Sequence, residues 1–295
     1  MKIIDPHLHL FNLEQGNYHW LYDDTIDFGY NKNIIQQSFT SRDLQLQPPL
    51  SLQAFVHIEA GFNNSQPWLE IDYLENEVKN SFKSVAGLDI TLPTKTFKEH
   101  LDKLTTYQSV AGIRDILDDR AVELLTNNNV ISNLKSIAEY NLTFELQMPL
   151  GDPESFRALV SAMDELNNLN IVINHLGWPN IDDDKFWKNW KSHIEILGKY
   201  ENIAIKCSGW EMTSDFAKKS PDEKTHLKAQ TIKHCLKHFS SERVLIASNF
   251  PLCLFEQSYQ SYWQSMISVL TNELDLNSCD IEKLCQKNAR NWYKL

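Results

Sequence analysis

Eight short apolar runs, separated by segments of helical periodicity, constrain the fold of this chain more than any other feature of its sequence. Each run is four to six residues long, the length of a buried strand rather than of a helix. They cover residues 3–8, 53–58, 85–89, 110–113, 142–146, 171–174, 203–206 and 244–247. The sequence therefore predicts eight strands.

The segments between these runs carry helix signals. Asp152-Pro153 is an N-cap followed by proline at the first helical position, and residues 220–223 read Ser-Pro-Asp-Glu, which is a capping box. Apolar stripes at helical spacing follow both starts, and a third runs from Tyr259 to Leu270. We interpret these stripes as core packing.

Alternation of buried strands with amphipathic helices favours a parallel sheet, and eight such units in 295 residues match a closed α/β barrel of the (β/α)8 type. An open doubly wound sheet is the alternative. However, no Gly-x-Gly-x-x-Gly motif follows the first strand, where the sequence reads Asp-Pro-His-Leu-His. We expect one TIM-barrel domain over residues 1–295, with the irregular residues 11–52 covering the barrel mouth or an edge.

Composition narrows the possible partners and location. The formal charge is -11, from 28 basic and 39 acidic residues, which argues against a nucleic-acid partner. No window approaches the ~20 apolar residues of a membrane span, and the first residues do not form a secretory signal. Five cysteines without a CxxC pair suggest reduced thiols in a cytoplasmic protein. The aromatic content is compatible with a homodimer.

In a barrel of this type the active site lies at the carboxyl ends of the strands, and polar residues gather at those positions here. His7 and His9 stand two apart on one strand, so both imidazoles point to the same face and can share a metal ion or a substrate. His175 follows the sixth apolar run and is expected to join them. Two ordinary strand-end histidines bonded to loop carbonyls are the alternative reading of the pair.

Charged residues at other strand ends complete the candidate site. Arg114 could clamp a substrate carboxylate with two parallel hydrogen bonds, or it could pair structurally with a nearby aspartate. Glu59 and Glu145 are the carboxylates best placed to act as metal ligand or general base, although Glu59 could equally be the buried partner of Lys206 or Arg114. Further candidate substrate-binding residues are Asp89, Gln147, Lys206 and Trp20.

These residues together resemble the amidohydrolase superfamily, in the branch of TIM-barrel metal-dependent hydrolases that includes 2-pyrone-4,6-dicarboxylate lactonase and L-fuconolactonase. The resemblance rests on motifs spread over the whole chain in matching order. They are Ile4-Asp5-Pro6-His7-Leu8-His9, Asn174-His175-Leu176-Gly177, Lys206-Cys207-Ser208-Gly209 and Ala247-Ser248-Asn249-Phe250-Pro251. It implies a (β/α)8 barrel in which an activated water attacks a lactone carbonyl.

The resemblance also implies roles for individual residues. In the superfamily the HxH pair binds a divalent metal, the sixth-strand histidine contacts metal or substrate, and an aspartate after the eighth strand acts as base. His7, His9 and His175 match this pattern, with Glu145 as a further metal-ligand candidate. Asn249 replaces the aspartate, and an amide cannot accept a proton from water. The metal, with zinc as first choice, is therefore expected to be weakly bound or absent, and Glu59, Glu145 or Asp115 could replace the base.

Three functions remain open at this stage. The first is a hydrolase acting on a small sugar-derived or dicarboxylic lactone. The second is a metal-dependent decarboxylase on the same barrel. The third is a catalytically silent barrel that binds a small acid or sugar, with Asn249 marking the loss of the base.

Overall fold

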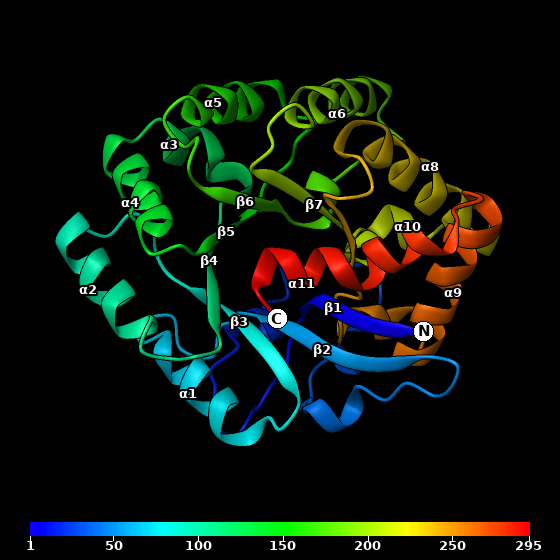
Figure 1. Cartoon of the computed structure of the whole chain (residues 1–295), viewed down its shortest axis with the longest axis horizontal. Helices are drawn as coiled ribbons and strands as arrows, with labels where there is room; N and C mark the ends of the chain where they lie inside the picture. Colours follow the sequence, from blue (N-terminus) through cyan, green and yellow to red (C-terminus); the bar gives the residue numbers. More distant parts are fainter.

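The computed structural model describes residues 1–295 and contains one sheet of eight parallel strands whose spatial order follows the sequence. The strands are β1 (Lys2–Leu8), β2 (Ser51–Ile58), β3 (Ser81–Gly87), β4 (Val110–Ile116), β5 (Thr143–Gln147), β6 (Asn170–Ile173), β7 (Ile203–Cys207) and β8 (Val244–Ile246) (Figure 1). Asn249 N donates to His7 O at 2.9 Å and His9 N to Phe250 O at 2.6 Å, which brings the chain after β8 back to β1. The predicted (β/α)8 barrel is confirmed.

Helices surround the sheet in the order expected for a barrel (Figure 1). Asp152 accepts a hydrogen bond from Ser155 N, and Ser220 and Glu223 form the predicted capping box. Both helix starts are therefore confirmed. The helices are α1 (Trp68–Glu77), α2 (Thr94–Leu104), α3 (Ala121–Leu125), α4 (Asn128–Glu139), α5 (Pro153–Met163), α6 (Asp184–Leu197), α7 (Ser214–Ala217), α8 (Pro221–Phe239), α9 (Tyr259–Ser268), α10 (Ser278–Glu282) and α11 (Asn288–Tyr293).

The largest difference from the predicted strands is in β3. It begins at Ser81, four residues before the apolar run, and ends at Gly87, two residues before the predicted end at Asp89. Its first residues, Ser-Phe-Lys-Ser, contain a single apolar side chain and form no apolar run, but their backbone pairs in register with residues 54–57 of β2. Backbone pairing does not depend on side-chain polarity, so hydrophobicity alone misses such a strand start.

Alternation along the strands divides the core into two parts. Side chains such as Phe55, Ile171 and Ile205 point outward and pack under the helices. Alternate residues point into the barrel, where Ile4, Val172, Ala204 and Leu245 are among those that form a small inner cluster with Ala289 and Tyr293 of α11. The same alternation continues toward the carboxyl ends of the strands, where Arg114, Glu145, Asn174 and Lys206 follow these apolar residues into the interior.

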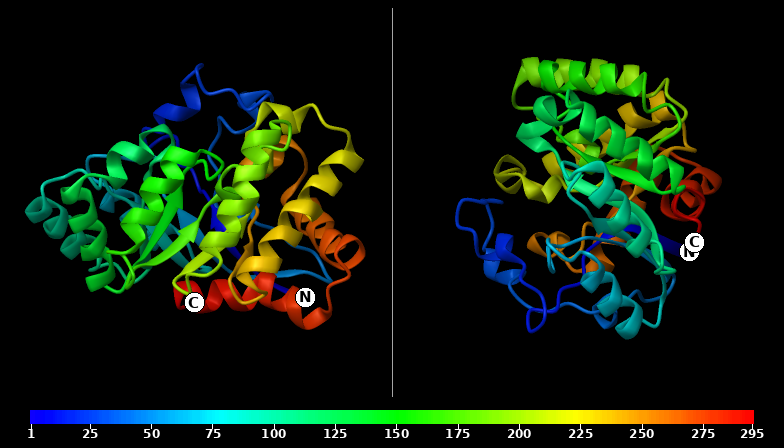
Figure 2. Two further views of the ribbon diagram at one scale, coloured as in Figure 1. Left: turned by 90° about the horizontal axis from the view of Figure 1, so that it is seen from above. Right: turned by 90° about the vertical axis from the view of Figure 1, so that its left-hand side faces the viewer.

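Different segments cover the two ends of the barrel. The chain between β1 and β2, with the short helices η1 (His19–Tyr22), η2 (Lys32–Ile34) and η3 (Ser41–Asp43), lies at the end opposite to the two chain termini (Figure 2). Leu21, Ile35 and Phe39 of this segment are buried. At the other end α11 crosses the barrel (Figure 1) and inserts Tyr293 into it.

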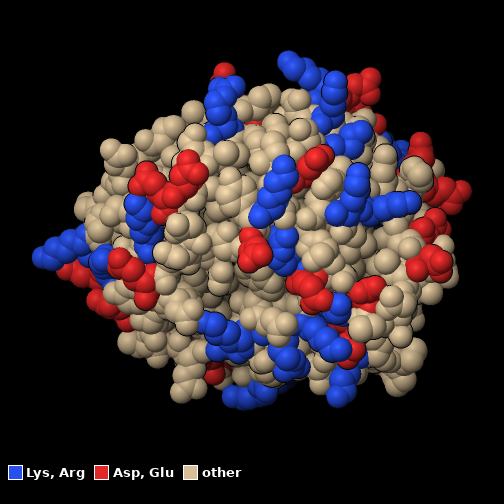
Figure 3. Space-filling view, turned by 45° about the horizontal axis from the view of Figure 1, so that its top comes forward, with Lys and Arg blue, Asp and Glu red and all other residues tan.

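On the face shown in Figure 3, acidic and basic side chains are mixed among uncharged residues, and the whole face does not carry charge of one sign. No helix of the structure has both the length and the hydropathy to span a membrane.

Candidate active site

His7, His9 and His175 come together inside the barrel at the carboxyl ends of β1 and β6. The ring centroid of His7 lies 5.1 Å from that of His9 and 4.6 Å from that of His175. Burial, reinforced by nearby positive charge, holds the pKa of each ring well below its ordinary value. The three imidazoles are therefore neutral near pH 7.

Each ring is oriented by the partner of its Nδ1 atom. His9 Nδ1 lies 2.8 Å from Ile58 O, and His175 Nδ1 lies 3.1 Å from Ser208 Oγ. His7 Nδ1 lies 3.4 Å from Lys206 Nζ, and its Nε2 is buried without a partner. Because an ammonium can only donate, this contact places the proton of His7 on Nε2. His7 thus offers one unused donor to the site.

The turn that presents His175 is unusual. His175, Leu176, Gly177 and Trp178 all have positive φ, between 50° and 67°. Left-handed backbone costs energy for residues other than glycine and persists where the surroundings impose it, often at functional sites. Gly209, with φ +77°, passes so close to His175 that a Cβ atom there would lie 2.4 Å from His175 Nδ1. The close packing of these two loops fixes the third imidazole.

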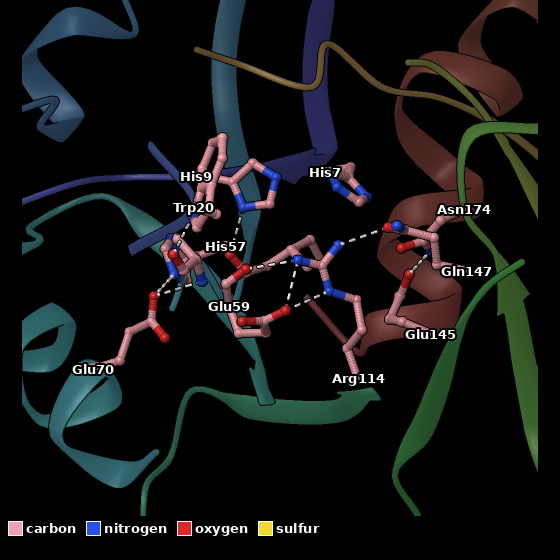
Figure 4. Close-up of polar contacts among 12 residues, drawn as sticks. His7, His9, Trp20, His57, Glu59, Glu70, Arg114, Glu145, Gln147 and Asn174 are labelled. Atoms are coloured by element: carbon pink, nitrogen blue, oxygen red, sulfur yellow. Dashed lines mark hydrogen bonds and ion pairs between the residues drawn. The ribbon is translucent and has the colours of Figure 1, made fainter. Parts of the chain in front are cut away.

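Lys206 and Glu145 form an ion pair deep in the barrel. Lys206 Nζ lies 2.6 Å from Glu145 Oε2, and both side chains are 0% exposed. Asn174 and Tyr293 also donate to the Glu145 carboxylate (Figure 4 shows the Asn174 contact). Burial lowers the pKa of Lys206 to about 8, against the opposing effect of the Glu145 carboxylate. Glu145 is thus held by three donors, which leaves it poorly suited to the expected roles of metal ligand or base.

Arg114 and Glu59 form a second pair nearer the mouth. Arg114 Nε and Nη2 lie 2.8 Å and 2.7 Å from Glu59 Oε1, and Nη2 also donates to Glu59 O at 2.8 Å. Arg114 Nη1 makes only a long contact of 3.4 Å to Gln147 Oε1 (Figure 4). The partner of Arg114 is Glu59 rather than a neighbouring aspartate. Its Nη1 group remains largely available to a substrate.

Asp118 and Trp178 extend the polar contacts from Gln147 towards His175. The sequence offered Asp118 only as a possible structural partner of Arg114 and did not single out Trp178. Asp118 accepts from Gln147 Nε2 and from Trp178 Nε1, both at 3.2 Å. The Trp178 ring lies 5.3 Å from that of His175. Asp118 and Trp178 follow β4 and β6 in loops without a recognisable motif, so only the fold shows that they meet.

Three expected residues lie outside this cluster or are committed elsewhere. Asp89 is exposed and accepts from Thr91 N and Thr91 Oγ1. Trp20 lies on the covering segment, and its indole N–H donates to Ala60 O at 2.8 Å. Asp115 points away from the interior because it follows the inward-facing Arg114, and it accepts from Ile90 N. Asp89 and Asp115 are thus not brought to the site.

Asn249 lies beside His7 after β8, with φ +56°. Its Nδ2 donates to Glu211 Oε1 at 2.7 Å, and its Oδ1 is buried without a partner. Burial raises the pKa of Glu211 to about 7, against the hydrogen bond from Asn249. Glu211 belongs to η6 (Trp210–Met212), and the sequence alone gave no reason to select it because no periodicity places a loop residue.

The residues present do not fit a divalent metal ion. His, Cys, Asp and Glu side chains form no group of three or more with metal-binding geometry. His7 presents an N–H rather than a lone pair, and two cations, Lys206 and Arg114, stand close to the imidazoles. The nearby carboxylates of Glu145 and Glu59 already neutralise these cations. The expected ligand set of His7, His9, His175 and Glu145 is therefore not assembled.

Comparisons with known proteins agree with this architecture. A family model described as Amidohydrolase matches residues 4–295. An L-rhamnono-gamma-lactonase of Scheffersomyces stipitis is 21% identical over 336 residues, covering 100% of this chain and 99% of that protein. Two solved structures share the fold. A zinc-bound amidohydrolase from Burkholderia multivorans has a TM-score of 0.80 at 16% identity, covering 100% of both chains. A 2-pyrone-4,6-dicarboxylic acid hydrolase from Pseudomonas putida, so described provisionally, has a TM-score of 0.72 at 20% identity, covering 99% and 97%.

Proposed function

Because this chain belongs to the amidohydrolase family, we propose that it is a hydrolase that opens a small lactone by addition of water to the ring carbonyl. The observation that carries the proposal is the meeting of an unpartnered His7 Nε2–H with two cationic side chains, Lys206 and Arg114, at the carboxyl ends of the strands. Such donors stabilise the negative charge that develops on a carbonyl oxygen when water attacks.

Each group has a distinct part in this scheme. His7 Nε2 donates to the carbonyl oxygen, and Lys206 keeps the His7 proton on that nitrogen. Arg114 Nη1 binds a carboxylate or hydroxyl of the substrate, since its other nitrogens are occupied by Glu59. His9 and His175, neutral and fixed through their Nδ1 atoms, offer Nε2 to hydroxyls or to the entering water. The substrate class that fits is a sugar-derived or dicarboxylic lactone.

The relatives support this class without defining the substrate. The names of two of them refer to cleavage of a cyclic ester, one of a sugar acid and one of a dicarboxylic pyrone. Both substrate types carry the anionic or hydroxyl groups that Arg114 can bind in this chain.

The test is a panel of aldonolactones and pyrone carboxylates, assayed by proton release before and after chelator treatment. We expect turnover of at least one lactone that survives the chelator, because the donor set does not fit a metal. His7→Gln should abolish it, whereas His226→Gln on the exposed surface of α8 should not. Carbon dioxide release, or binding without turnover across the panel, would contradict the proposal.

A further inference from the structure

Lactone hydrolysis needs a group that accepts a proton from water, and the buried carboxylates differ in whether they can do so. Four acidic side chains are buried, namely Asp5, Glu70, Glu145 and Glu211. Asp5 accepts from His7 N, Ser248 N and Tyr259 Oη. Glu70 is bonded to His57 Nε2 and Ala60 N, and Glu145 is bonded to Lys206, Asn174 and Tyr293.

Glu211 is the exception. Its one side-chain hydrogen bond comes from the neutral amide of Asn249, and no Lys, Arg or His nitrogen lies within 4.0 Å of its carboxylate. It is therefore the least committed of the four carboxylates. When a carboxylate takes up a proton, it loses the interactions that stabilise its charge. This loss is smaller for an acid with a single neutral donor than for one that is paired with an ammonium.

The position of Glu211 also connects it to the imidazoles. Its neighbours Gly209 and Trp210 line a cavity of about 20 Å³ together with His175 and Ser208, which is room for about one water. On its other side Asn249 is joined through its backbone to His7 O at 2.9 Å. Glu211 and the unpartnered Asn249 Oδ1 thus lie between the elements that carry His7 and His175.

Charged and titratable groups approach Glu211 from several elements. Lys228 of α8 favours its ionised form, whereas Glu256, after η7 (Leu252–Phe255), disfavours it. Tyr30, Cys253 and Tyr262 face it as neutral groups, since burial raises the pKa of all three. Lys224 already pairs with Glu256 at 2.8 Å, so Glu256 is not free to replace Glu211.

We propose that Glu211, held by Asn249, is the general base of the hydrolytic site; the assignment rests on the proposed lactonase function. The water oxygen bonds to the lactone carbonyl carbon as one water proton passes to the Glu211 carboxylate. The tetrahedral intermediate then collapses, the ring C–O bond breaks, and the leaving alkoxide takes the proton back from Glu211. Asn249 Oδ1 accepts the second water hydrogen and so orients the attack.

Two isosteric exchanges test this assignment. Glu211→Gln should lower kcat by a factor of about 10² to 10⁴ with little change in KM, because general-base catalysis contributes that much. The wild type should gain kcat/KM as the pH rises through about 7, where Glu211 loses its proton, and the variant should lose this rise. Adding Asn249→Asp to Glu211→Gln returns a carboxylate to the pair and should restore part of the activity.

Glu256→Gln is the matched control, since it neutralises a neighbouring carboxylate that pairs with Lys224. It should keep the rise of kcat/KM with pH, with the midpoint moved to somewhat lower pH because Glu256 no longer opposes the ionised form of Glu211. Retention of full activity by Glu211→Gln would overturn the assignment. So would a lower melting temperature with an unaltered pH profile, which would indicate a structural carboxylate.

A direct titration separates failure of this assignment from failure of the proposed function. In protein labelled at its glutamate carboxyl carbons, one NMR signal should titrate near neutrality and be absent from Glu211→Gln. If the wild type hydrolyses no lactone, the lactonase proposal fails by itself and this signal decides the role of Glu211. If the Glu211 carboxylate stayed ionised throughout about pH 5 to 9, its assignment as general base would be refuted, because a base must exchange its proton near the working pH.

Discussion

Two ion pairs inside the same barrel differ in how completely the protein satisfies them. The Lys206–Glu145 pair is 0% exposed and has two further donors, Asn174 and Tyr293. The Arg114–Glu59 side chains are 6% and 15% exposed, and Arg114 Nη1 has only a long contact. The deep pair has several further partners inside the protein, whereas the outer pair leaves Arg114 Nη1 with only that long contact.

This difference indicates that the deep pair positions other side chains, whereas the outer pair can bind a substrate. A fully buried ion pair contributes little net stability, but removal of one partner leaves an uncompensated charge. The deep pair therefore fixes His7 and the interior electrostatics. The outer pair holds a guanidinium in place while one of its edges can still bind a substrate.

The largest expected effect follows from Glu145→Gln. The exchange keeps the volume but leaves the Lys206 ammonium without its counter-charge, which should lower the free energy of unfolding by about 3 to 5 kcal/mol. Urea denaturation measures the change. Adding Lys206→Met should recover most of the loss. If Glu145→Gln alone were as stable as the wild type, Lys206 would not depend on Glu145 for its counter-charge.

A smaller effect is expected from Tyr293→Phe, which removes one donor to the Glu145 carboxylate from α11. Hydrogen bonds to charged groups are worth about 1.5 to 3 kcal/mol, so the unfolding free energy should fall by an amount in that range. Urea denaturation again provides the measurement. A change confined to substrate affinity would instead place Tyr293 in recognition.

Arg114→Lys tests the outer pair. Lysine keeps the charge but loses the planar fork that bonds Glu59 with one edge and leaves Nη1 for a substrate group. KM should therefore rise roughly ten- to a hundredfold, the value of one charge-assisted hydrogen bond. The melting temperature should change less than in Glu145→Gln. Steady-state kinetics on the substrate found by the panel measures this change in KM. A large loss of stability with unchanged KM would show that the outer pair is structural as well.

The smallest effect is expected from a surface pair that serves as reference for both. Lys98 Nζ and Glu139 Oε2 lie 2.9 Å apart, with side chains 42% and 60% exposed. Solvent screens such pairs, so Lys98→Met should change the unfolding free energy by less than about 1 kcal/mol. A larger change by urea denaturation would mean that burial is not what distinguishes the two interior pairs.

Local sequence signals predicted several elements of the barrel. The capping box at Ser220 and the proline after Asp152 predicted two helix starts, because such caps act within one turn of chain. The two-residue strand period predicted that His7 and His9 share a face. The start of β3 was missed because its polar residues pair through their backbone.

What the sequence determined by itself is the barrel and the set of strand ends at which polar side chains gather, since the periods of strands and helices are local properties of the chain. Only the tertiary structure decided which side chains at these strand ends bond to one another. Glu145 could have been a ligand or a base until Lys206 and Tyr293, which are 61 and 148 residues away in sequence, were seen to bond it. Glu211 has no motif of its own and becomes a candidate because the fold gives it a hydrogen bond from Asn249 and no directly paired cation. Charge compensation depends on distances in space, and no sequence period specifies those.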